Sequence, residues 1–203
     1  MATPPDAATF ERCMAVGGVA VFPSDTVYGL ACDPDSREAV ARLYALKRRP
    51  AGKPSAVMFF DAQLALGALP ELGPRTRALL RRLLPGGVTL LLRNPLGRFP
   101  LACGEDPGTL GLRVPDVPGL REVRWPVLQS SANAAGAPDA RRLADVPEAI
   151  RLAADLVIDA GELPGTPSTV IDLRRFEEAG AWTVVRPGAV EPDAVARAVA
   201  ETR

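Results

Sequence analysis

A cluster of cationic side chains is the first feature of the sequence that suggests chemistry. In the stretch LYALKRRPAGKPSAVMFF, residues 43–60, Lys47, Arg48, Arg49 and Lys53 lie within seven positions of a chain whose Lys+Arg and Asp+Glu counts are both 24. A solvated helix end is one interpretation, because the helix macrodipole favours each cation near a C-terminus by about 0.3–1 kcal/mol. A binding site for a polyanion is the other interpretation.

Polar side chains also gather at four places where a predicted strand begins or ends. Hydroxyl, amide and charged groups at strand ends are the usual way in which an α/β protein presents a small-molecule site. The alternative is a turn whose Asp or Ser side chain only caps local backbone donors. The four groups are Ser24, Asp25, Thr26 and Tyr28; Ser130, Ser131 and Asn133; Ser168 and Thr169; and Arg186.

Two common nucleotide-binding motifs do not occur in the sequence. It contains neither G-x-x-x-x-G-K-[ST] nor G-x-G-x-x-G. A nucleotide would therefore be bound by neither the P-loop nor the Rossmann fingerprint. Strand-end loops that converge and offer hydroxyls and cations would still form a pocket for an anion.

Composition narrows the function classes. Of the 203 residues, 47% are hydrophobic and 24% are charged, which is typical of a globular protein. A formal net charge of zero argues against binding of long nucleic-acid duplexes as the main activity. The sequence has no histidine, which removes Ser-His and Cys-His nucleophiles and His-ligated metals. The cysteines, Cys13, Cys32 and Cys103, are expected to be buried thiols.

Hydropathy gives no sign of a membrane segment. No apolar run reaches the roughly 18 residues that a membrane span needs, and no secretory signal is recognisable. We therefore expect a cytoplasmic protein that does not contact a membrane.

Apolar periodicity predicts alternating strands and helices. The expected fold is a single α/β domain over residues 1–203, with a core of about 10–190, in which helices flank a twisted mixed β-sheet. A capping box at Asp35 and Glu38 is expected to start a helix that runs to about Leu46. Strands are expected at 18–23, 55–60, 88–94, 109–115, 126–131, 155–161, 168–173 and 182–188, and further helices at 6–17, 61–69, 74–84, 115–123, 145–154 and 191–201.

Some residues inside this framework have predicted environments. A polar loop that holds residues 24–28 is expected after the first strand, where Tyr28 either lines a site or packs in the core. Helix 74–84 carries four arginines and is expected to be amphipathic with a charged face, and contact with RNA is the alternative. The sheet core is expected to contain Val19, Val21, Val57, Leu90, Leu92, Val170 and Ile171.

Taken together, these stretches resemble the YrdC/YciO family. The resemblance rests on motifs that occur in the family's order between about Val19 and Val190, namely PSDTVYGL, KRRP with the following KP, PGGVTLLL, LRVP, SSANAAG, STVIDL and RPG. It implies a YrdC/RibB-like fold. It also implies the activity of the synthase branch, a nucleotidyltransferase that makes threonylcarbamoyl-adenylate and pyrophosphate from L-threonine, bicarbonate or CO2, and ATP, for threonylcarbamoyladenosine modification of tRNA.

The resemblance implies roles for individual residues. A Lys, Arg, Ser and Asn quartet marks the synthase branch and matches the catalytic candidates Lys47, Arg49, Ser131 and Asn133. Because Pro50 biases Arg49 away from helical dihedrals, Lys47 and Arg49 are expected to face one pocket and clamp the polyphosphate. The ATP-binding candidates are Lys47, Arg49, Lys53, Thr89, Ser131, Asn133 and Arg186, and the threonine-binding candidates are Ser24, Arg113 and Ser168.

The same resemblance implies cofactors and partners. Mg²⁺ is expected to arrive with ATP, held by phosphate oxygens and water rather than by a protein metal site. Asp25 is a candidate to contact a water of that ion. The implied downstream partner is the tRNA threonylcarbamoyl transferase machinery, with a weak direct contact to tRNA or other RNA left open.

The sequence departs from the family pattern at three places, one of which is KPSAVM in place of the commoner K/N-P-L form, and alternatives remain. Ser24 stands where the family usually has threonine, and Ala135 stands where it commonly has serine. One alternative is a YciO-like RNA-binding protein without synthase activity, against which the complete quartet argues. The other is a different carbamoyl-adenylate-forming domain, since the KRRP and KPSAVM stretch also resembles the hydrogenase-maturation carbamoyltransferases. Nucleotide turnover distinguishes the synthase from the RNA-binding alternative.

Overall fold

The computed structural model describes residues 6–50 and 52–202, and its strands form one mixed sheet. The strands are β1 (Ala20–Pro23), β2 (Tyr28–Cys32), β3 (Ala56–Met58), β4 (Val88–Arg93), β5 (Thr109–Arg113), β6 (Val127–Ser131), β7 (Leu156–Val157), β8 (Thr169–Asp172) and β9 (Thr183–Arg186). Their order in the sheet is β7-β1-β2-β6-β3-β5-β4-β8-β9. The pairs β1/β7, β3/β5 and β4/β8 are parallel and the others antiparallel. This is the predicted α/β fold.

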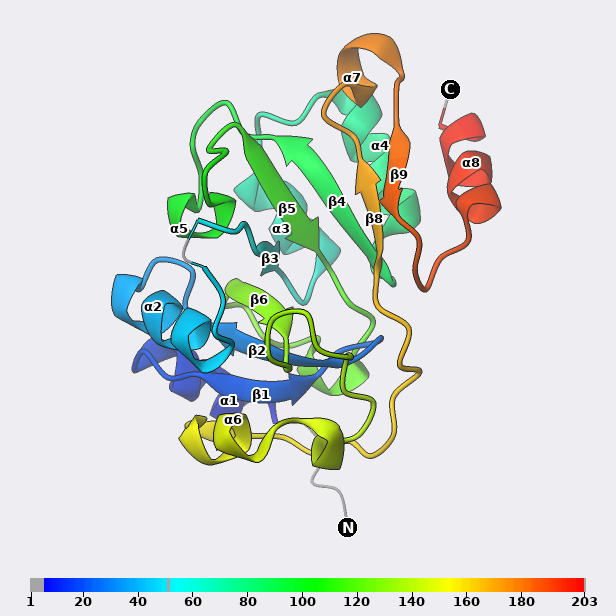
Figure 1. Ribbon diagram of the computed structural model, residues 1–203. Helices are drawn as coiled ribbons and strands as arrows, with labels where there is room; N and C mark the ends of the chain where they lie inside the picture. The colour runs from blue at the N-terminus through cyan, green and yellow to red at the C-terminus, as the bar shows by residue number, and fades with distance from the viewer. Residues whose placement is uncertain (1–5, 51, 203) are drawn as a thin grey trace.

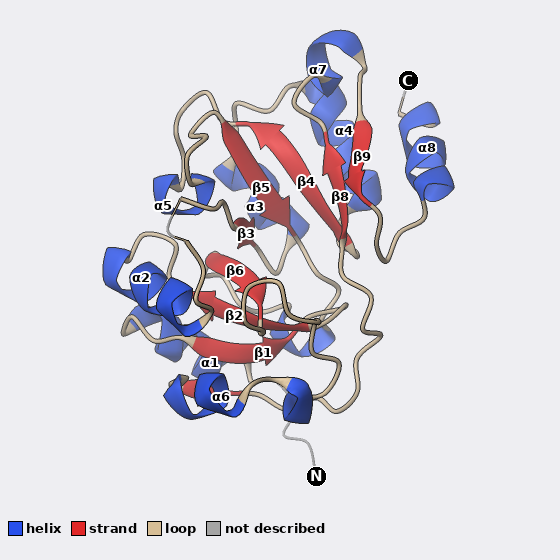
Figure 2. Cartoon of the chain, in the orientation of Figure 1, coloured by secondary structure: helices blue, strands red, loops and turns tan. Residues whose placement is uncertain are grey.

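Helices flank the sheet but leave part of one face uncovered (Figures 1 and 2). They are α1 (Ala7–Ala15), α2 (Arg37–Leu46), α3 (Ala62–Ala68), α4 (Pro74–Leu83), α5 (Pro100–Cys103), α6 (Glu148–Ala153), α7 (Phe176–Ala179) and α8 (Pro192–Ala200), with 3-10 turns at Pro118–Leu120 and Leu143–Asp145. In Figure 1, α1, α2 and α6 accompany β1, β2 and β6 in the lower part, whereas α3 and α4 lie behind β4 and β5. Figure 2 shows the near face of β4 and β5 without a helix over it.

Local side-chain caps determine where the helices begin. Asp6 accepts a hydrogen bond from Ala8 N at the start of α1, and Asp61 accepts from Gln63 N and Leu64 N at the start of α3. At α2 the predicted capping box is wrong, because Ser36 is the N-cap and its Oγ accepts from Ala39 N at 3.2 Å. Asp35 instead belongs to the preceding turn.

The structure differs from the predicted elements in three further places. Tyr28, predicted to lie in a polar loop, begins β2 (residues 28–32), a strand that was not predicted and that is buried along its whole length between β1 and β6. The predicted helix 115–123 is reduced to one 3-10 turn, because Pro115 and Pro118 lack the N–H donors that a longer helix requires. The short helices α5 and α7 were not predicted.

Two apolar clusters hold the sheet and helices together. In the smaller one, the rings of Phe10, Phe22 and Phe60 make edge contacts with centroids 5.4–6.2 Å apart, which fastens α1 to β1. The larger cluster contains the predicted core residues except Val170, which is only half-buried. Cys32 and Cys103 are buried as predicted, Cys13 is half-buried, and all three are free thiols.

The helices are short, and α2 and α4 have 10 residues each. Across residues 6–50 and 52–202, no helix has both the length and the apolar character required to cross a membrane.

Candidate functional site

A polar cavity of about 200 Å³ lies where the β1–β2 turn, the α2–β3 loop and the middle strands of the sheet meet. We call it the arginine cavity, because Arg49, Arg113 and Arg186 all line it. Its other lining residues are Thr26, Val27, Pro54, Ser55, Ala56, Thr89, Gln129, Ser130, Ser131, Asp139, Pro167, Ser168 and Val170. Segments from most of the chain therefore contribute to one small space.

Arg113, at the end of β5, is a buried cation of this cavity. Only 3% of the residue is exposed, and its Nη2 lies 2.8 Å from Asp25 Oδ1 and 3.3 Å from Thr26 Oγ1. Burial lowers the pKa of Arg113, and the neighbouring Asp25 carboxylate opposes that effect. Asp25 is thus the ion-pair partner of Arg113.

Arg186, on β9, is fixed by hydrogen bonds to the chain just before β8. Its Nη2 donates to Ser168 O at 2.7 Å, and Ser168 Oγ lies 2.7 Å from Thr89 Oγ1. The parallel pairing of β4 with β8 and the antiparallel pairing of β8 with β9 bring these three residues together. The nucleotide candidates Thr89 and Arg186 and the threonine candidate Ser168 thus share one network.

At the C-terminus of α2, Arg49 lines the cavity and Lys47 contacts the loop after β6. Arg48 has a left-handed φ of 51°, which turns the chain sharply between Lys47 and Arg49. Arg49 lines the cavity and its Nη2 donates to Pro54 O at 2.6 Å. Lys47 is not among the lining residues, and its Nζ bonds to Ser131 and Asn133 at the end of β6 and in the loop that follows.

Lys47 is buried against three oxygen atoms. Its Nζ donates to Asn133 O at 2.7 Å, to Asn133 Oδ1 at 2.9 Å and to Ser131 O, and only 1% of the residue is exposed. An ammonium has three N–H donors, so each has an acceptor here. Burial lowers the pKa of Lys47 to about 8, and the nearby Arg49 charge contributes.

Asn133 is the centre of the loop that Lys47 holds. Its Oδ1 also accepts from Ser131 Oγ at 2.7 Å, and its Nδ2 donates to Ala137 O at 2.6 Å and to Asp139 Oδ1 at 3.1 Å. Lys47 and Asn133 therefore shape the loop, whereas Ser131 and Asp139 form part of the cavity wall. Ala135, which replaces the family's serine, is exposed on this loop.

Two other candidates lie outside the cavity wall of the described chain. Ser24 is 2% exposed, and its Oγ accepts from Thr26 N and Val27 N and donates to Val27 O, so it caps the turn that presents Thr26. Lys53 is exposed on the α2–β3 loop beside Pro54, a lining residue.

Tyr28 packs rather than lining the site. The residue is fully buried, and its hydroxyl bonds to Asp159 Oδ1 at 3.0 Å and to Gly161 O at 2.9 Å, while Ala160 N donates to it at 3.0 Å. Burial raises the pKa of Tyr28 to about 12. Tyr28 therefore anchors the beginning of segment 158–168, the connection to β8.

Several lining residues had no predicted role, and some left a signal in the sequence. Gln129 is a polar residue in the apolar strand 126–131, and it lies beside Gly29, where a Cβ atom would be 3.0 Å from its Nε2. Ser55 belongs to the quoted KPSAVM stretch but had no predicted role, and Asp139 follows the SSANAAG motif without belonging to it. A polar residue in the interior of an otherwise apolar strand could have indicated a lining residue, and among these residues Gln129 has that pattern.

The cavity continues along the uncovered face of the sheet. A neighbouring hollow of about 350 Å³, which we call the apolar extension, shares Pro54, Ser55, Ala56, Thr89 and Val170 with the arginine cavity. Beyond them it is lined by Leu91, Cys103, Asp106, Thr109, Gly111 and Arg174. Half-buried Val170 thus faces this space instead of the core.

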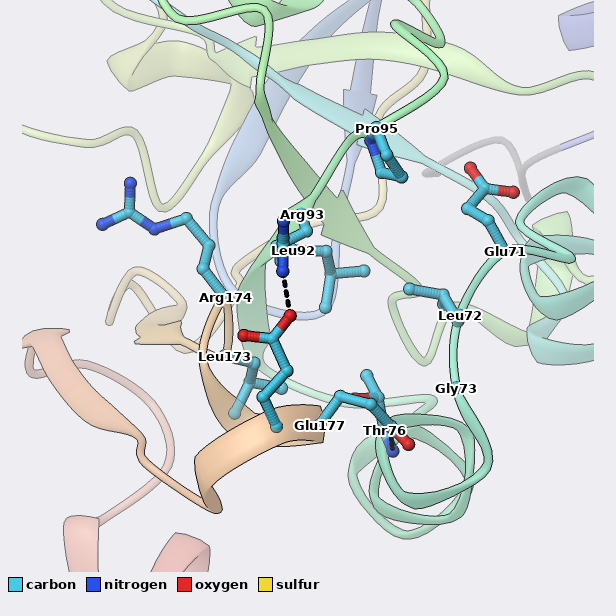
Figure 3. Close-up of a pocket in the computed structure, with 11 residues that line it drawn as sticks. Glu71, Leu72, Gly73, Thr76, Leu92, Arg93, Pro95, Leu173, Arg174 and Glu177 are labelled. Atoms are coloured by element: carbon cyan, nitrogen blue, oxygen red, sulfur yellow. Dashed lines mark hydrogen bonds and ion pairs between the residues drawn. The ribbon is translucent and has the colours of Figure 1, made fainter.

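A separate pocket near α4 and α7 is lined by charged groups that hold these elements together (Figure 3). Its wall shares no residue with the arginine cavity. Glu177 accepts from Thr76 N at 2.7 Å and so caps α4, and the dashed line in Figure 3 marks the ion pair of Arg93 with Glu178. Its charged groups join α7 to α4 and β4.

Three of the four arginines of α4 have partners within the protein. Arg77 donates to Leu66 O at 3.0 Å, Arg82 pairs with Glu201 at 2.6 Å, and the Arg75 guanidinium lies 5.0 Å from the Phe176 ring centroid. Their contacts fit the amphipathic-helix interpretation. No contact with RNA is needed to account for them.

The fold and the site define an α/β protein in which three arginines line a polar cavity beside the middle strands of a mixed sheet. The family model Sua5_yciO_yrdC, described as "Telomere recombination", matches residues 12–188. The chain belongs to this Sua5/YciO/YrdC family, which confirms the predicted resemblance.

Individual relatives agree with this assignment. The chain is 36% identical over 165 residues to the threonylcarbamoyl-AMP synthase of Chromohalobacter salexigens, covering 79% of this chain and 89% of the relative. The crystal structure of P. abyssi Sua5 complexed with L-threonine matches with a TM-score of 0.81 and 27% identity, over 95% of this chain and 57% of that one. E. coli YciO matches with a TM-score of 0.76 and 25% identity, over 94% and 96%.

Proposed function

We propose that this protein is an L-threonylcarbamoyladenylate synthase, a nucleotidyltransferase that converts L-threonine, bicarbonate or CO2 and ATP into threonylcarbamoyl-AMP and pyrophosphate. The observation that carries the proposal is the convergence of Arg49, Arg113 and Arg186 on one cavity in a member of this family. The proposed reaction joins anions, and cations fixed in advance around them are what it requires.

The chemistry agrees with the residues present. The amine of threonine captures carbon dioxide derived from bicarbonate as a carbamate, one of whose oxygens attacks the α-phosphorus of ATP and expels pyrophosphate. A carbamate is already an anion, so the attack needs no general base, in keeping with a chain that has no histidine. Alignment of the two substrates and neutralisation of their charges remain as the catalytic tasks.

The geometry supports a division of these tasks within the site. We assign the phosphates to Arg49 and Arg186 and the threonine carboxylate to Arg113, whose guanidinium suits a planar acceptor. Thr89, Ser131 and Ser168 offer hydroxyls to either substrate. The apolar extension offers a surface for the purine, since its wall includes Leu91, Val170 and Gly111.

Magnesium enters this proposal as part of the MgATP substrate. Among residues 6–50 and 52–202 no group of three or more His, Cys, Asp or Glu side chains is arranged to hold a metal. Phosphate oxygens and water would therefore provide most of the ion's ligands. Asp25 already forms an ion pair with Arg113. Asp139 lines the cavity wall and accepts a hydrogen bond from Asn133, so it is the acidic side chain available to a water of the ion.

The proposed product has a cellular destination. A mixed anhydride of a carbamate and AMP is an activated acyl donor, so a transferase acting on tRNA would be the partner that consumes it. We place this activity in the cytoplasm, where ATP and tRNA are available.

Pyrophosphate release tests the proposal. With MgATP, we expect release that requires both L-threonine and bicarbonate. Arg49→Ala is expected to lower kcat by about 10²–10³-fold, as loss of one strong donor to developing charge does. Arg48→Asn is the matched control: it removes the adjacent cation, Arg48 is exposed, and Asn tolerates the left-handed φ, so its rate should match that of the wild type.

Two results would count against the synthase. Release that does not depend on threonine would exclude it, and absence of release together with RNA binding would favour the YciO-like alternative. An equal loss in Arg48→Asn and Arg49→Ala would show that charge near α2, not the cavity contact of Arg49, matters.

A further inference from the structure

The turn between β1 and β2 carries Asp25, whose two carboxylate oxygens both accept hydrogen bonds. Asp25 Oδ1 pairs with Arg113 Nη2 at 2.8 Å, and Oδ2 accepts from Asp116 N at 3.3 Å. The two side chains of the pair are 10% and 4% exposed. Asp25 therefore links the turn to the segment after β5 and lies against a cation that lines the arginine cavity.

This pairing leaves the rest of the Arg113 guanidinium for a ligand. Nη2 is used by Asp25 and Thr26, and Nε is buried without a hydrogen-bond partner anywhere in the described chain. A buried donor without an acceptor is costly, so an acceptor that a bound ligand brought to this nitrogen would be stabilising. A carboxylate that takes two parallel N–H donors from this guanidinium uses Nη2, so it replaces the 3.3 Å contact of Nη2 with Thr26 Oγ1.

Asp25 also changes what the cavity attracts. Arg113 and Asp25 together carry no net charge, whereas Arg49 makes its hydrogen bond to Pro54 O and Arg186 to Ser168 O, both neutral carbonyls. Asp139 is the acidic residue that lines the wall, and it accepts from the Asn133 amide. A polyphosphate is drawn by net charge, so the neutralised Arg113 is its weakest attractor among the three arginines.

We propose that Asp25 is a specificity-determining residue of this cavity, which cancels the charge of Arg113 and orients its guanidinium so that this end accepts an amino-acid carboxylate and rejects phosphate. The inference rests on the proposed function. In this proposal Asp25 is a positioning residue that acts through Arg113. The carboxylate binds at the Arg113 end of the cavity, and the more highly charged phosphates bind elsewhere in it.

Direct binding separates this role from a merely structural one. Binding of L-threonine and of inorganic pyrophosphate to wild type and Asp25→Asn is measured by calorimetry, without turnover. Asn keeps the size of the side chain and removes its charge. We expect the Kd for threonine to rise about tenfold and the Kd for pyrophosphate to fall about tenfold, because a freed buried cation attracts the more highly charged anion.

Further variants define the outcomes. Asp25→Glu keeps the charge and should retain wild-type pyrophosphate affinity. Asp116→Asn removes a nearby negative charge whose side chain pairs with Arg121, so it should change neither affinity. Thermal unfolding of each variant checks that it is folded.

The results distinguish failure of this inference from failure of the proposed function. If Asp25→Asn is folded and binds both ligands more weakly, or binds pyrophosphate unchanged, the assignment of Asp25 is overturned while threonine binding by the wild type still supports the synthase. If the wild type binds no threonine but Asp25→Asn gains affinity for pyrophosphate, the charge partition is supported and the synthase is not. If neither protein binds either ligand, both proposals are overturned.

Discussion

At the scale of single residues, Lys47 shows that a sequence can identify the type of a residue without predicting which groups its side chain contacts. The sequence identifies a lysine in a cationic cluster, but its neighbour Arg48 has a φ of 51°, which no local propensity predicts. That one backbone angle leaves Arg49 at the cavity and Lys47 under the loop after β6. The candidate residues could be predicted from the sequence. Which of them line the cavity and which hold the neighbouring loop could not.

Replacing Lys47 should loosen this loop. Lys47→Met keeps the apolar length of the side chain and leaves three oxygens of Ser131 and Asn133 without their donor. We expect the free energy of unfolding, measured in urea, to fall by on the order of 3 kcal/mol, because buried acceptors lose their hydrogen bonds. Arg48→Asn should change it by less than about 0.5 kcal/mol. Equal unfolding free energies for wild type and Lys47→Met would refute the loop-supporting role.

The same variant has a pH signature. The pKa of Lys47 is lowered to about 8 in the folded protein, against about 10.4 for an unperturbed lysine. Between these values the unfolded chain holds a proton that the folded protein lacks, so the contribution of Lys47 to the free energy of unfolding rises with pH. The difference in unfolding free energy between wild type and Lys47→Met should therefore increase from about pH 8 to about pH 10. A flat difference would contradict the lowered pKa.

At the scale of elements, periodicity identified most strands and helices, and the exceptions have physical reasons. β2 (residues 28–32) contains Gly29 and Ala31 and no β-branched residue, so its local preference for a strand is weak. It forms because β1 and β6 pair with it on both sides. The strand predicted at 155–161 is reduced to β7, two residues long, and α5 and α7 are single turns, which are too short for a periodic pattern.

The floor of the apolar extension gives a prediction about β5. A Cβ atom at Gly111 would lie 3.4 Å from Ala56 Cα, an ordinary contact, so the strand accommodates Gly111→Val while the extension loses space. We expect KM for ATP to rise about tenfold while threonine binding is unchanged, since a filled apolar pocket discriminates on this scale.

A second glycine substitution provides the control for Gly111→Val. Gly67 lies in α3, and a Cβ atom added there would meet no heavy atom within 4 Å. Gly67→Ala should therefore leave KM unchanged and stabilise the protein by about 1 kcal/mol. A rise in the threonine Kd of Gly111→Val would show that the extension also serves threonine.

At the scale of the whole molecule, long connections determine which polar groups meet. Segment 158–168 leads from β7, at one edge of the sheet, to β8, next to the opposite edge (Figure 1). Along the way Gly165 N donates to Thr26 O at 2.9 Å, and Pro167 and Ser168 join the cavity wall. The sequence supported a mixed sheet but contained no sign of this strand order, which depends on pairings far apart in the chain.

Tyr28 is the anchor by which this connection can be tested. Tyr28→Phe removes the hydroxyl that contacts Asp159, Ala160 and Gly161 and leaves the ring in place. We expect the free energy of unfolding in urea to fall by about 1–3 kcal/mol. Amide hydrogen exchange should quicken at Gly161 and Gly165. Unchanged exchange at Gly165 would mean that its bond to Thr26 holds the segment without Tyr28.

The spread of the cavity over the chain, from Thr26 to Arg186, has a consequence for protein synthesis. The ribosome releases the N-terminal part first, so Arg49 and Arg113 emerge long before the strand that carries Arg186. A nascent chain that stops short of β9 lacks Arg186, the third arginine of the cavity. In such a chain β8 also lacks the neighbouring strand β9. Ligands that bind the finished cavity stabilise only the finished fold. Their cellular concentrations therefore bias the last step of folding and leave the earlier ones untouched.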